Sequence, residues 1–268
     1  SHAAAYAKIA YQTAYLKAHH ASSFLAASMS ADMNNTDNIH LLFDDCKLNS
    51  VELLPPDVNE SSYKFIPLDN NQILYGLGAI KGTGDSSIDL ILEERKNNGP
   101  YKSLFDFTSR LDLTKVNRRV VESLVRSGAF DKIEPNRASL LASVSLAIKM
   151  AEQSKNEVGQ EGLFGSSDIE AIKLVEMTPW EEKIQLLEEK AALGFYFSGH
   201  LFSYYKKIIK SFISTKLIDL KPRQESYLIA GIVSSVKYRQ SSRGKIAIIT
   251  IDDGEASIDA VLGNNLLT

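Results

Sequence analysis

The sequence predicts a mainly α-helical chain with a small, segregated β region at its C-terminal end, an α+β fold class. Apolar residues recur at helical spacing through most of the chain, whereas "SYLIAGIVSSVKYRQSSRGKIAIITIDDGEASIDAVL" holds three β-branched runs separated by turns. The 268 residues, 44% of them hydrophobic, suffice for one large domain or two to three small ones. One cysteine excludes an internal disulfide framework, and no apolar stretch approaches the roughly 20 residues that span a bilayer. We therefore expect a soluble, cytoplasmic protein without a membrane partner.

The N-terminal part of the chain is predicted to be helical. In residues 3–18 the helical repeat places Tyr6, Ile9 and Leu16 on one side of a first helix, and a second helix follows through Met29. The chain begins with Ser-His-Ala-Ala-Ala, without a methionine or a signal-peptide pattern. This start indicates a portion of a longer protein.

The following elements are predicted from caps, prolines and periodicity. Asn35 or Thr36 can cap a third helix that ends near Lys47, and "VELLPPD" is typical of a short strand stopped by two prolines. A later helix is expected to begin with Pro179 at its first position. Between them, helices are predicted over residues 86–96, 103–110, 115–127 and 137–157.

Charge is segregated along the chain although the net charge is only -3. Residues 151–189 carry ten acidic and three basic side chains, whereas residues 206–245 carry ten Lys or Arg and two acids. One interpretation of such a run of charge is simply the solvent-exposed face of a helix. The excess of positive charge in the second stretch favours a polyanionic partner for the C-terminal part.

Four glycines, at positions 76, 78, 82 and 84, precede a predicted helix in "LYGLGAIKGTGDSSIDLIL". A dinucleotide fingerprint needs a third glycine where this chain has Lys81, and a Walker loop needs Lys after the glycine rather than before it. The spacing of Leu77, Ile80, Gly82 and Gly84 before an apolar helix is instead that of a helix-hairpin-helix, whose turn approaches a nucleic-acid backbone.

The N–H groups of this turn are predicted to hold a phosphate oxygen at the positive end of the second helix, without sequence preference. An ordinary turn between helices is the alternative. The DNA-binding residues expected here are Lys81, Gly82, Thr83 and Gly84.

A degenerate second copy of the motif follows in "VNRRVVESLVRSGAFD", with apolar Val116, Val120 and Leu124 before a single glycine. Such motifs usually occur in pairs because two helix pairs pack into one small core. The arginines are expected to add salt-dependent binding. The DNA-binding residues expected in this copy are Arg118, Arg119 and Gly128.

These and other stretches of the chain resemble a known protein family. The stretches "SHAAAYAKIAYQTAYLKAHH", "LLPPDVNES", "YGLGAIKGTG", "NRRVVESLVRSGAFD" and "ALGFYFSGH" occur in the order found in bacterial replicative DNA polymerase III alpha subunits, C-family DNA polymerases. The resemblance runs along the whole chain and implies an interior part of such a subunit. It implies four regions: residues 1–70 as the end of the fingers, 71–158 as the tandem helix-hairpin-helix domain, 159–205 as a clamp-binding loop with a helical connector, and 206–268 as a partial OB-fold.

The resemblance also gives a role to "GQEGLFG", which otherwise is an exposed apolar pair that could fold back on its own domain. In this family a short peptide at this place inserts into the sliding clamp. Gln160, Leu163 and Phe164 match its pattern, while Gly162 stands where Ser or Asp is commoner. Two apolar anchors would fill a pocket and the glutamine would orient them.

By the same resemblance, the C-terminal strands imply a surface for single-stranded template, built from stacking and charge. The first helix implies a corner beside the incoming nucleotide. The template-binding residues expected are Tyr238, Arg239, Arg243 and Lys245, and the nucleotide-pocket residues are Ser1, His2 and Tyr6.

Polymerase chemistry needs clustered carboxylates that hold two magnesium ions. Asp252 and Asp253 are adjacent in a predicted hairpin turn, and the five histidines show no metal-ligand spacing with Cys46. We therefore expect no catalytic residues, metal ligands or cofactor in this chain, which alone should be inactive. The resemblance places the carboxylates and their magnesium in the palm, upstream of residue 1.

The expected function is thus part of a replicative DNA polymerase whose partners are primer-template duplex, single-stranded template, the sliding clamp and other replisome subunits. A DNA-repair glycosylase, ligase or nuclease is the alternative, because such enzymes also carry helix-hairpin-helix and OB modules. A glycosylase needs a catalytic Asp after its hairpin, whereas Asp85 and Asp89 lie on the motif's own helix. A ligase needs a Lys-x-Asp-Gly motif, which is missing from this sequence. A scaffold that binds only proteins is the third possibility.

Overall fold

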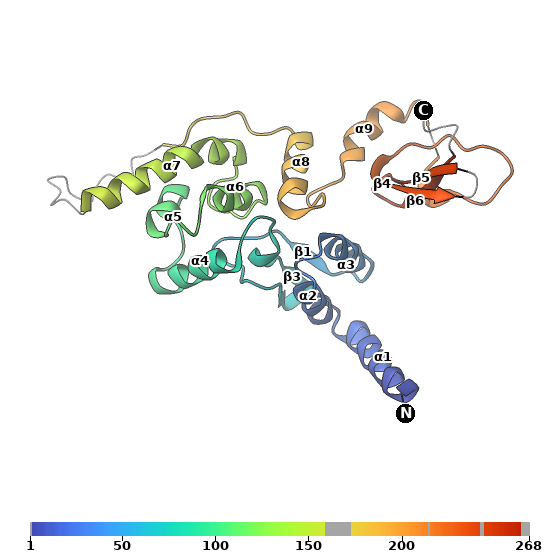
Figure 1. The fold of residues 1–268 in the computed structure, drawn as a ribbon, viewed down its shortest axis with the longest axis horizontal. Helices are drawn as coiled ribbons and strands as arrows, with labels where there is room; N and C mark the ends of the chain where they lie inside the picture. The colour runs from blue at the N-terminus through green and yellow to red at the C-terminus, as the bar shows by residue number, and fades with distance from the viewer. Residues whose placement is uncertain (1, 159–172, 214, 242–243, 264–268) are drawn as a thin grey trace. The chain divides into compact units, whose positions relative to one another are not determined.

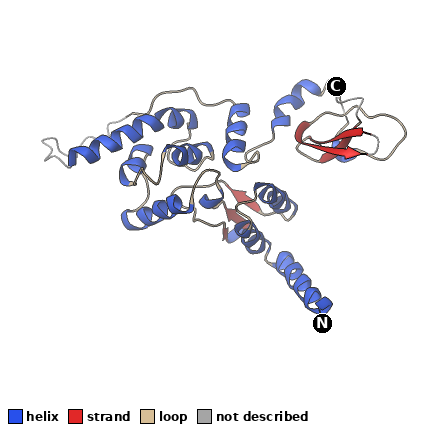
Figure 2. Cartoon of the chain, in the orientation of Figure 1, coloured by secondary structure: helices blue, strands red, loops and turns tan. Residues whose placement is uncertain are grey.

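The computed structural model describes residues 2–158, 173–213, 215–241 and 244–263. The chain forms two compact units, Ser1–Phe195 and Tyr196–Thr268. The first unit is largely helical with one small sheet, and the second carries a separate sheet near the C-terminus (Figures 1 and 2). The predicted fold class, mainly α with a small C-terminal β region, is confirmed.

The first unit begins with three helices whose order was predicted. Asn35 is the N-cap of the third, where its side chain accepts the N–H of Asn38 at 3.2 Å. The first helix buries none of its residues, so the face that carries Tyr6 and Ile9 is exposed. Lys17, in its last turn, binds Asp45 of the third helix at 2.6 Å. The bounds are α1 His2–His19, α2 Ala21–Ala31 and α3 Thr36–Leu48.

A three-stranded sheet follows, of which the sequence predicted only the first strand. Strand β3 lies in the centre, parallel to β1 and antiparallel to β2. All three strands are three residues long, and Asn70 and Asn71 turn the chain between β2 and β3 with left-handed φ values of 64° and 61°. Asparagine adopts this conformation more readily than most residues. The bounds are β1 Glu52–Leu54, β2 Ile66–Leu68, the 3₁₀-helix η1 Asp69–Asn71, and β3 Gln72–Leu74.

The next helices enclose an aromatic core. Tyr101 packs edge-on against Phe107 with ring centroids 4.7 Å apart, and Phe107 packs in the same way against Phe130 at 5.1 Å. Burying each large apolar side chain contributes roughly 1.5–3 kcal/mol. These elements match the predicted ranges within a few residues. They are the 3₁₀-helix η2 Leu77–Ala79, and the helices α4 Asp85–Asn98, α5 Leu104–Arg110, α6 Arg118–Arg126 and α7 Arg137–Val158.

Helix α8 (Glu182–Leu193) starts later than predicted. Pro179 lies before the helix rather than at its first position. The chain ahead of the helix is extended along α7. There the N–H groups of Val175 and Met177 donate to the hydroxyls of Ser143 and Ser139, at 2.8 and 3.0 Å. These bonds keep the backbone extended up to the start of α8.

The second unit contains the predicted meander of three antiparallel strands, in the order β4-β5-β6. Ala247 in the central strand is buried, whereas Val233 and Val236 on β4 are exposed. No helix in the described ranges is long and apolar enough to cross a membrane. The bounds are α9 Leu201–Ile209, the 3₁₀-helix η4 Leu217–Asp219, β4 Ile232–Ser241, β5 Gly244–Asp252 and β6 Ser257–Leu262.

Candidate nucleic-acid interface

The first candidate surface is the Gly82 turn, residues 80–85, which joins η2 to α4. Gly82 has a φ of 83°, a left-handed conformation that favours glycine. Gly84 is the N-cap of α4, and apart from its chain neighbours nothing lies within 4 Å of the place a Cβ would take. The N–H of Thr83 donates to the carbonyl of Ile80 at 3.3 Å, as does its hydroxyl at 2.6 Å. The Thr83 N–H therefore closes the turn, contrary to expectation, and the open side lies at Gly84.

Helix α6 lies beside this turn through Arg119 and Ser123. A Cβ on Gly82 would lie 3.2 Å from Nε of Arg119 and 3.3 Å from the hydroxyl of Ser123, so the first turn of α6 packs against the glycine. Arg118 is 66% exposed and pairs with Glu122 at 2.6 Å. The two motifs are thus brought together, and Arg119 adds positive charge next to the turn.

Lys81, the other cation of the turn, is directed toward α8. Its N–H donates to the carbonyl of Ala192 at 2.8 Å. A Cβ on Gly194, which caps α8, would lie 2.8 Å from the Lys81 ammonium. The negative end of a helix dipole attracts such a charge. The position of Lys81 therefore ties the Gly82 turn to the end of α8.

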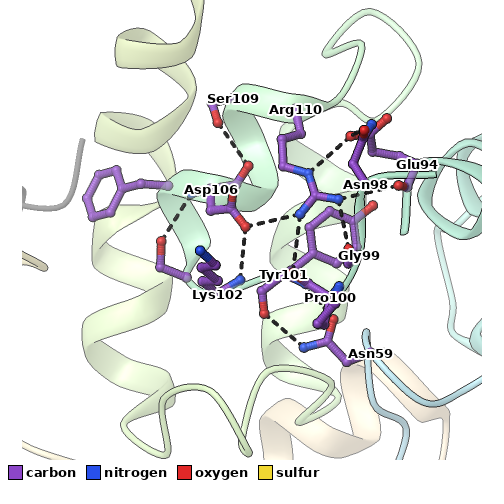
Figure 3. Close-up of polar contacts among 12 residues, drawn as sticks. Asn59, Glu94, Asn98, Gly99, Pro100, Tyr101, Lys102, Asp106, Ser109 and Arg110 are labelled. Atoms are coloured by element: carbon purple, nitrogen blue, oxygen red, sulfur yellow. Dashed lines mark hydrogen bonds and ion pairs between the residues drawn. The ribbon is translucent and has the colours of Figure 1, made fainter. Parts of the chain in front are cut away.

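The far end of α4 is held by Arg110 of α5 (Figure 3). Its guanidinium donates to the carbonyls of Gly99 at 2.9 Å and Pro100 at 3.3 Å, and pairs with Glu94 at 3.0 Å and Asp106 at 3.2 Å. Burial lowers the pKa of Arg110. The hydrogen bond to Glu94 and the charge of Asp106 raise the pKa by more than burial lowers it, so the net pKa is above its ordinary value. This bonding fixes the helix whose opposite end forms the Gly82 turn.

The Gly128 turn, residues 127–131, ends the second motif. Its glycine has a φ of 86°, and Leu124 in the preceding helix is fully buried, as the repeat predicted. The surroundings differ from those of the first turn. A Cβ on Gly128 would overlap the guanidinium of Arg137 and lie 2.9 Å from Oδ2 of Asp131. An internal cation therefore occupies the space over this glycine.

Arg137 forms a buried ionic cluster. It is 8% exposed, binds Asp131 at 2.6 Å, and binds Glu189 of α8, itself 1% exposed, at 3.0 Å. Burial lowers the pKa of the guanidinium, but hydrogen bonds and charges from Asp131 and Glu189 raise it above its ordinary value. The cluster holds the Gly128 turn to α8.

Neither Arg137 nor Tyr63, which lies against the first motif, was predicted from the sequence. Arg137 meets Glu189 across 52 positions of sequence, so no local pattern could pair them. A signal for Tyr63 existed in Gly76 and Gly78, because closely spaced glycines mark places where another part of the chain approaches. The partner itself was not predictable from that signal.

In the second unit, the predicted template-binding residues divide between two faces of the sheet. Tyr238 is 61% exposed and pairs in register with Ala247, and the ammonium of Lys245 lies 4.4 Å from the centre of its ring. Arg239 is the next residue on the strand and pairs with Ile246, so its side chain projects from the opposite face. Of the three template-binding residues in the described ranges, the structure brings together Tyr238 and Lys245.

Near the N-terminus, the rings of His2 and Tyr6 meet edge-on with centroids 4.6 Å apart on an exposed helix. This geometry is compatible with a shared surface but supplies no pocket by itself. Five predicted site residues lie outside the described part of the chain: Ser1, Gln160, Leu163, Phe164 and Arg243.

The adjacent carboxylates at the β5–β6 turn do not fit a magnesium pair. Asp253 accepts the N–H groups of Leu217 and Glu255, both at 2.9 Å, and Asp252 accepts the N–H of Gly254 at 2.7 Å. Both therefore act as turn caps. In the described ranges no group of three or more His, Cys, Asp or Glu is arranged to hold a metal ion.

The motif geometry agrees with comparisons to known proteins. A family model described as a helix-hairpin-helix motif matches residues 50–140, which include both glycine turns. The DNA polymerase III subunit alpha of Neisseria meningitidis serogroup B (strain ATCC BAA-335 / MC58) is 45% identical over 269 residues, which cover 100% of this chain and 23% of the relative. The subunits of Vibrio cholerae and Escherichia coli K12 are each 40% identical over 277 residues, covering 100% of this chain and 24% of the relative.

The chain thus spans about a quarter of the length of the curated relatives it matches, 23% and 24% in these three. The aligned region covers the whole chain, so it includes both the unit with the two glycine turns and the unit with the C-terminal sheet. The chain belongs to the family of DNA polymerase III alpha subunits and corresponds to a part of that longer protein.

Proposed function

We propose that this chain serves a DNA-directed DNA polymerase by binding the backbone of duplex DNA at the Gly82 turn. The observation that carries the proposal is the open side of the turn at Gly84, where the first turn of α4 begins and Arg119 stands alongside. The helix-hairpin-helix match over residues 50–140 supports it.

The physical basis is the positive end of α4. The first N–H groups of a helix lack partners within the helix and attract anions, and a turn without side chains lets a phosphate approach them. The arginines at 118 and 119 add charge that releases counterions from DNA. The contact carries no sequence information, which suits an enzyme that copies any template.

A titration of labelled duplexes with wild-type and Gly84→Val chains tests this function. Gly84 has an ordinary φ of -91° and open space, so valine should fold normally while holding the phosphate away. We expect about tenfold weaker binding to duplexes of unrelated sequence, a loss of about 1.4 kcal/mol. The matched control is Gly99→Ala at the other end of α4, which should bind as wild type. Equal binding by Gly84→Val and wild type would contradict the proposal.

For the second unit we propose that single-stranded template stacks on Tyr238, with Lys245 beside it. Tyr238→Ala should cost roughly 1–3 kcal/mol in single-strand affinity, the range for one base stacked on an aromatic ring. Arg239→Ala is the control, because it changes the charge on the opposite face. The measurement belongs in the longer protein. An unchanged single-strand affinity for Tyr238→Ala would contradict stacking on this ring.

We further propose that Gln160, Leu163 and Phe164 dock the sliding clamp, a role that rests on the family pattern in the sequence. Leu163→Ala with Phe164→Ala should lower clamp affinity about a hundredfold, because each anchor buries apolar surface in the complex. Gln160→Ala should cost about 0.5–1.5 kcal/mol for one hydrogen bond. Gly162→Ser should tighten binding slightly by restricting the free chain. If the double variant instead unfolds earlier and binds the clamp normally, the pair belongs to the core.

Nucleotide contacts from Ser1, His2 and Tyr6, and binding of other replisome subunits, are proposals from family resemblance alone. We assign polymerase chemistry and its magnesium ions to parts of the longer protein beyond this chain. Exchange of His2 for Ala in that protein should then raise the KM for nucleotide and leave duplex affinity unchanged. An unchanged KM would remove His2 from the pocket.

A further inference from the structure

The first motif carries a strap formed by residues 62–65. The N–H of Leu77 donates to the carbonyl of Ser62 at 2.9 Å, and the N–H of Gly78 donates to that of Tyr63 at 3.0 Å. A Cβ on Gly76 would lie 2.6 Å from the Lys64 carbonyl carbon, and one on Gly78 would lie 2.8 Å from the Tyr63 ring. These two glycines are therefore needed for the strap rather than for a phosphate.

Tyr63 also reaches the other arm of the motif. Its hydroxyl donates to Oδ1 of Asp85 at 2.5 Å, and Asp85 is the first residue of α4, directly after Gly84. The hydrogen bond to Asp85, with burial and the charges of Asp85 and Asp89, raises the pKa of Tyr63 to about 12. The phenol is thus a firm donor at neutral pH. One side chain joins η2 to α4 across the Gly82 turn.

The position of Asp85 creates a conflict with an anion at this turn. A carboxylate in the first turn of a helix is attracted by the same N–H groups that attract a phosphate, and it repels the phosphate. Tyr63 lies over η2, and nothing but chain neighbours lies within 4 Å of a Cβ at Gly84. The hydrogen bond therefore ties Oδ1 of the Asp85 carboxylate to a phenol whose ring lies against Gly78 of η2.

We propose that Tyr63 is a positioning residue for DNA binding, which holds the Asp85 carboxylate off the phosphate site. The inference rests on the proposed function of the Gly82 turn. If the inference is correct, the Tyr63 hydroxyl affects DNA binding only when the Asp85 carboxylate is present. A general contribution of Tyr63 to the fold would not depend on that carboxylate.

A double-mutant cycle in the full 268-residue chain tests this inference. Duplex affinity is measured for wild type, Tyr63→Phe, Asp85→Asn and the double variant. Phenylalanine keeps the ring on Gly78, so folding is retained and thermal unfolding is recorded as a check. We expect Tyr63→Phe to weaken duplex binding about three- to tenfold with Asp85 present, and to have less than a twofold effect in the Asp85→Asn background, which itself binds at least as well as wild type.

The same loss in both backgrounds, or no loss with Asp85 present, overturns the inference. Gly84→Val, titrated in parallel, distinguishes failure of the proposed phosphate site from failure of the role of Tyr63. If that variant binds as wild type, the proposed phosphate site fails. If it binds weakly while Tyr63→Phe binds normally, only the role of Tyr63 fails.

Discussion

The Gly82 turn and the Gly128 turn share a sequence signature and differ in what faces them. Both glycines are left-handed, with φ of 83° and 86°. The neighbouring Gly84 opens the first turn to solvent, whereas the Arg137 guanidinium covers the second. A left-handed glycine therefore makes a tight turn possible, while the residues around it decide whether the turn can bind a phosphate.

Helix α8 contributes to both turns, with opposite consequences. It accepts the Lys81 N–H through the Ala192 carbonyl and leaves the Gly84 side open. At the second turn it supplies Glu189, which completes the buried cluster of Arg137. We therefore propose that the Gly82 turn binds DNA and that the Gly128 turn belongs to the core, although the sequence predicted both as binding turns.

The largest expected effect concerns the covered turn. Arg137→Met leaves Glu189 buried without its cation, and removing one partner of a buried pair costs about 3–5 kcal/mol. Chemical unfolding measures this loss. Arg118→Met is the control, because its exposed pair with Glu122 should contribute no more than about 1 kcal/mol. Similar losses in the two variants would contradict a structural role specific to the Gly128 turn.

A smaller effect is expected from the glycine itself. Gly128→Ala places a methyl group where the Arg137 guanidinium lies and forces alanine into a left-handed conformation, which together should destabilise by about 2 kcal/mol. Gly99→Ala has a similar φ of 82° but open space, so it should cost about 1 kcal/mol. The difference between the two isolates the contact with Arg137. Equal losses would mean that the contact contributes nothing.

Salt dependence separates the arginines beside the two turns. Arg119→Gln, next to Gly82, should reduce the slope of log affinity against log salt by about 1. Arg126, which precedes the Gly128 turn, pairs with Glu122 and Glu188, so Arg126→Gln should leave the slope unchanged. Duplex titrations at several salt concentrations supply both slopes. A reduced slope for Arg126→Gln would place DNA at the second turn as well.

The smallest effect is a pH dependence at the open turn. The pKa of Tyr63 is raised from 10.0 to about 12, so its hydrogen bond to Asp85 stabilises the folded chain fully below pH 10 and is lost as pH rises toward 12. Ultraviolet titration of wild type minus Tyr63→Phe, in rapid pH jumps, should show this high midpoint. In the Asp85→Asn background the midpoint should fall toward 10. A midpoint near 10 with Asp85 present would contradict the hydrogen bond.

Much of the fold was predictable because local signals determine it. Helical periodicity and an Asn35 cap located α1 to α3, and β-branched runs between turns located the C-terminal meander. Strands β2 and β3 were missed, because three residues are too few to establish an alternating pattern and no pair of prolines follows them, as it does β1. The start of α8 was misplaced, because bonds from residues 175 and 177 to α7 override the preference of proline for a helix start.

The candidate site was predictable only in part, for a similar reason. The left-handed glycines follow from spacing, and Arg119 follows from its place in the second motif. The cover over Gly128 depends on Arg137 and on Glu189 from a distant helix, which no spacing rule connects. Likewise no role was predicted for Gly76 and Gly78, whereas the structure pairs them with the strap at 62–65.

The central claim is that one glycine turn binds DNA and the other does not. Duplex titrations of Gly84→Val and Gly128→Ala, each corrected for the folded fraction found in parallel unfolding curves, test it most directly. We expect about tenfold weaker binding per folded molecule for Gly84→Val, with stability lowered by no more than about 1 kcal/mol through the changed N-cap, and lowered stability with wild-type affinity per folded molecule for Gly128→Ala. Wild-type affinity for Gly84→Val, or an equal loss of affinity per folded molecule in both variants, would contradict the claim.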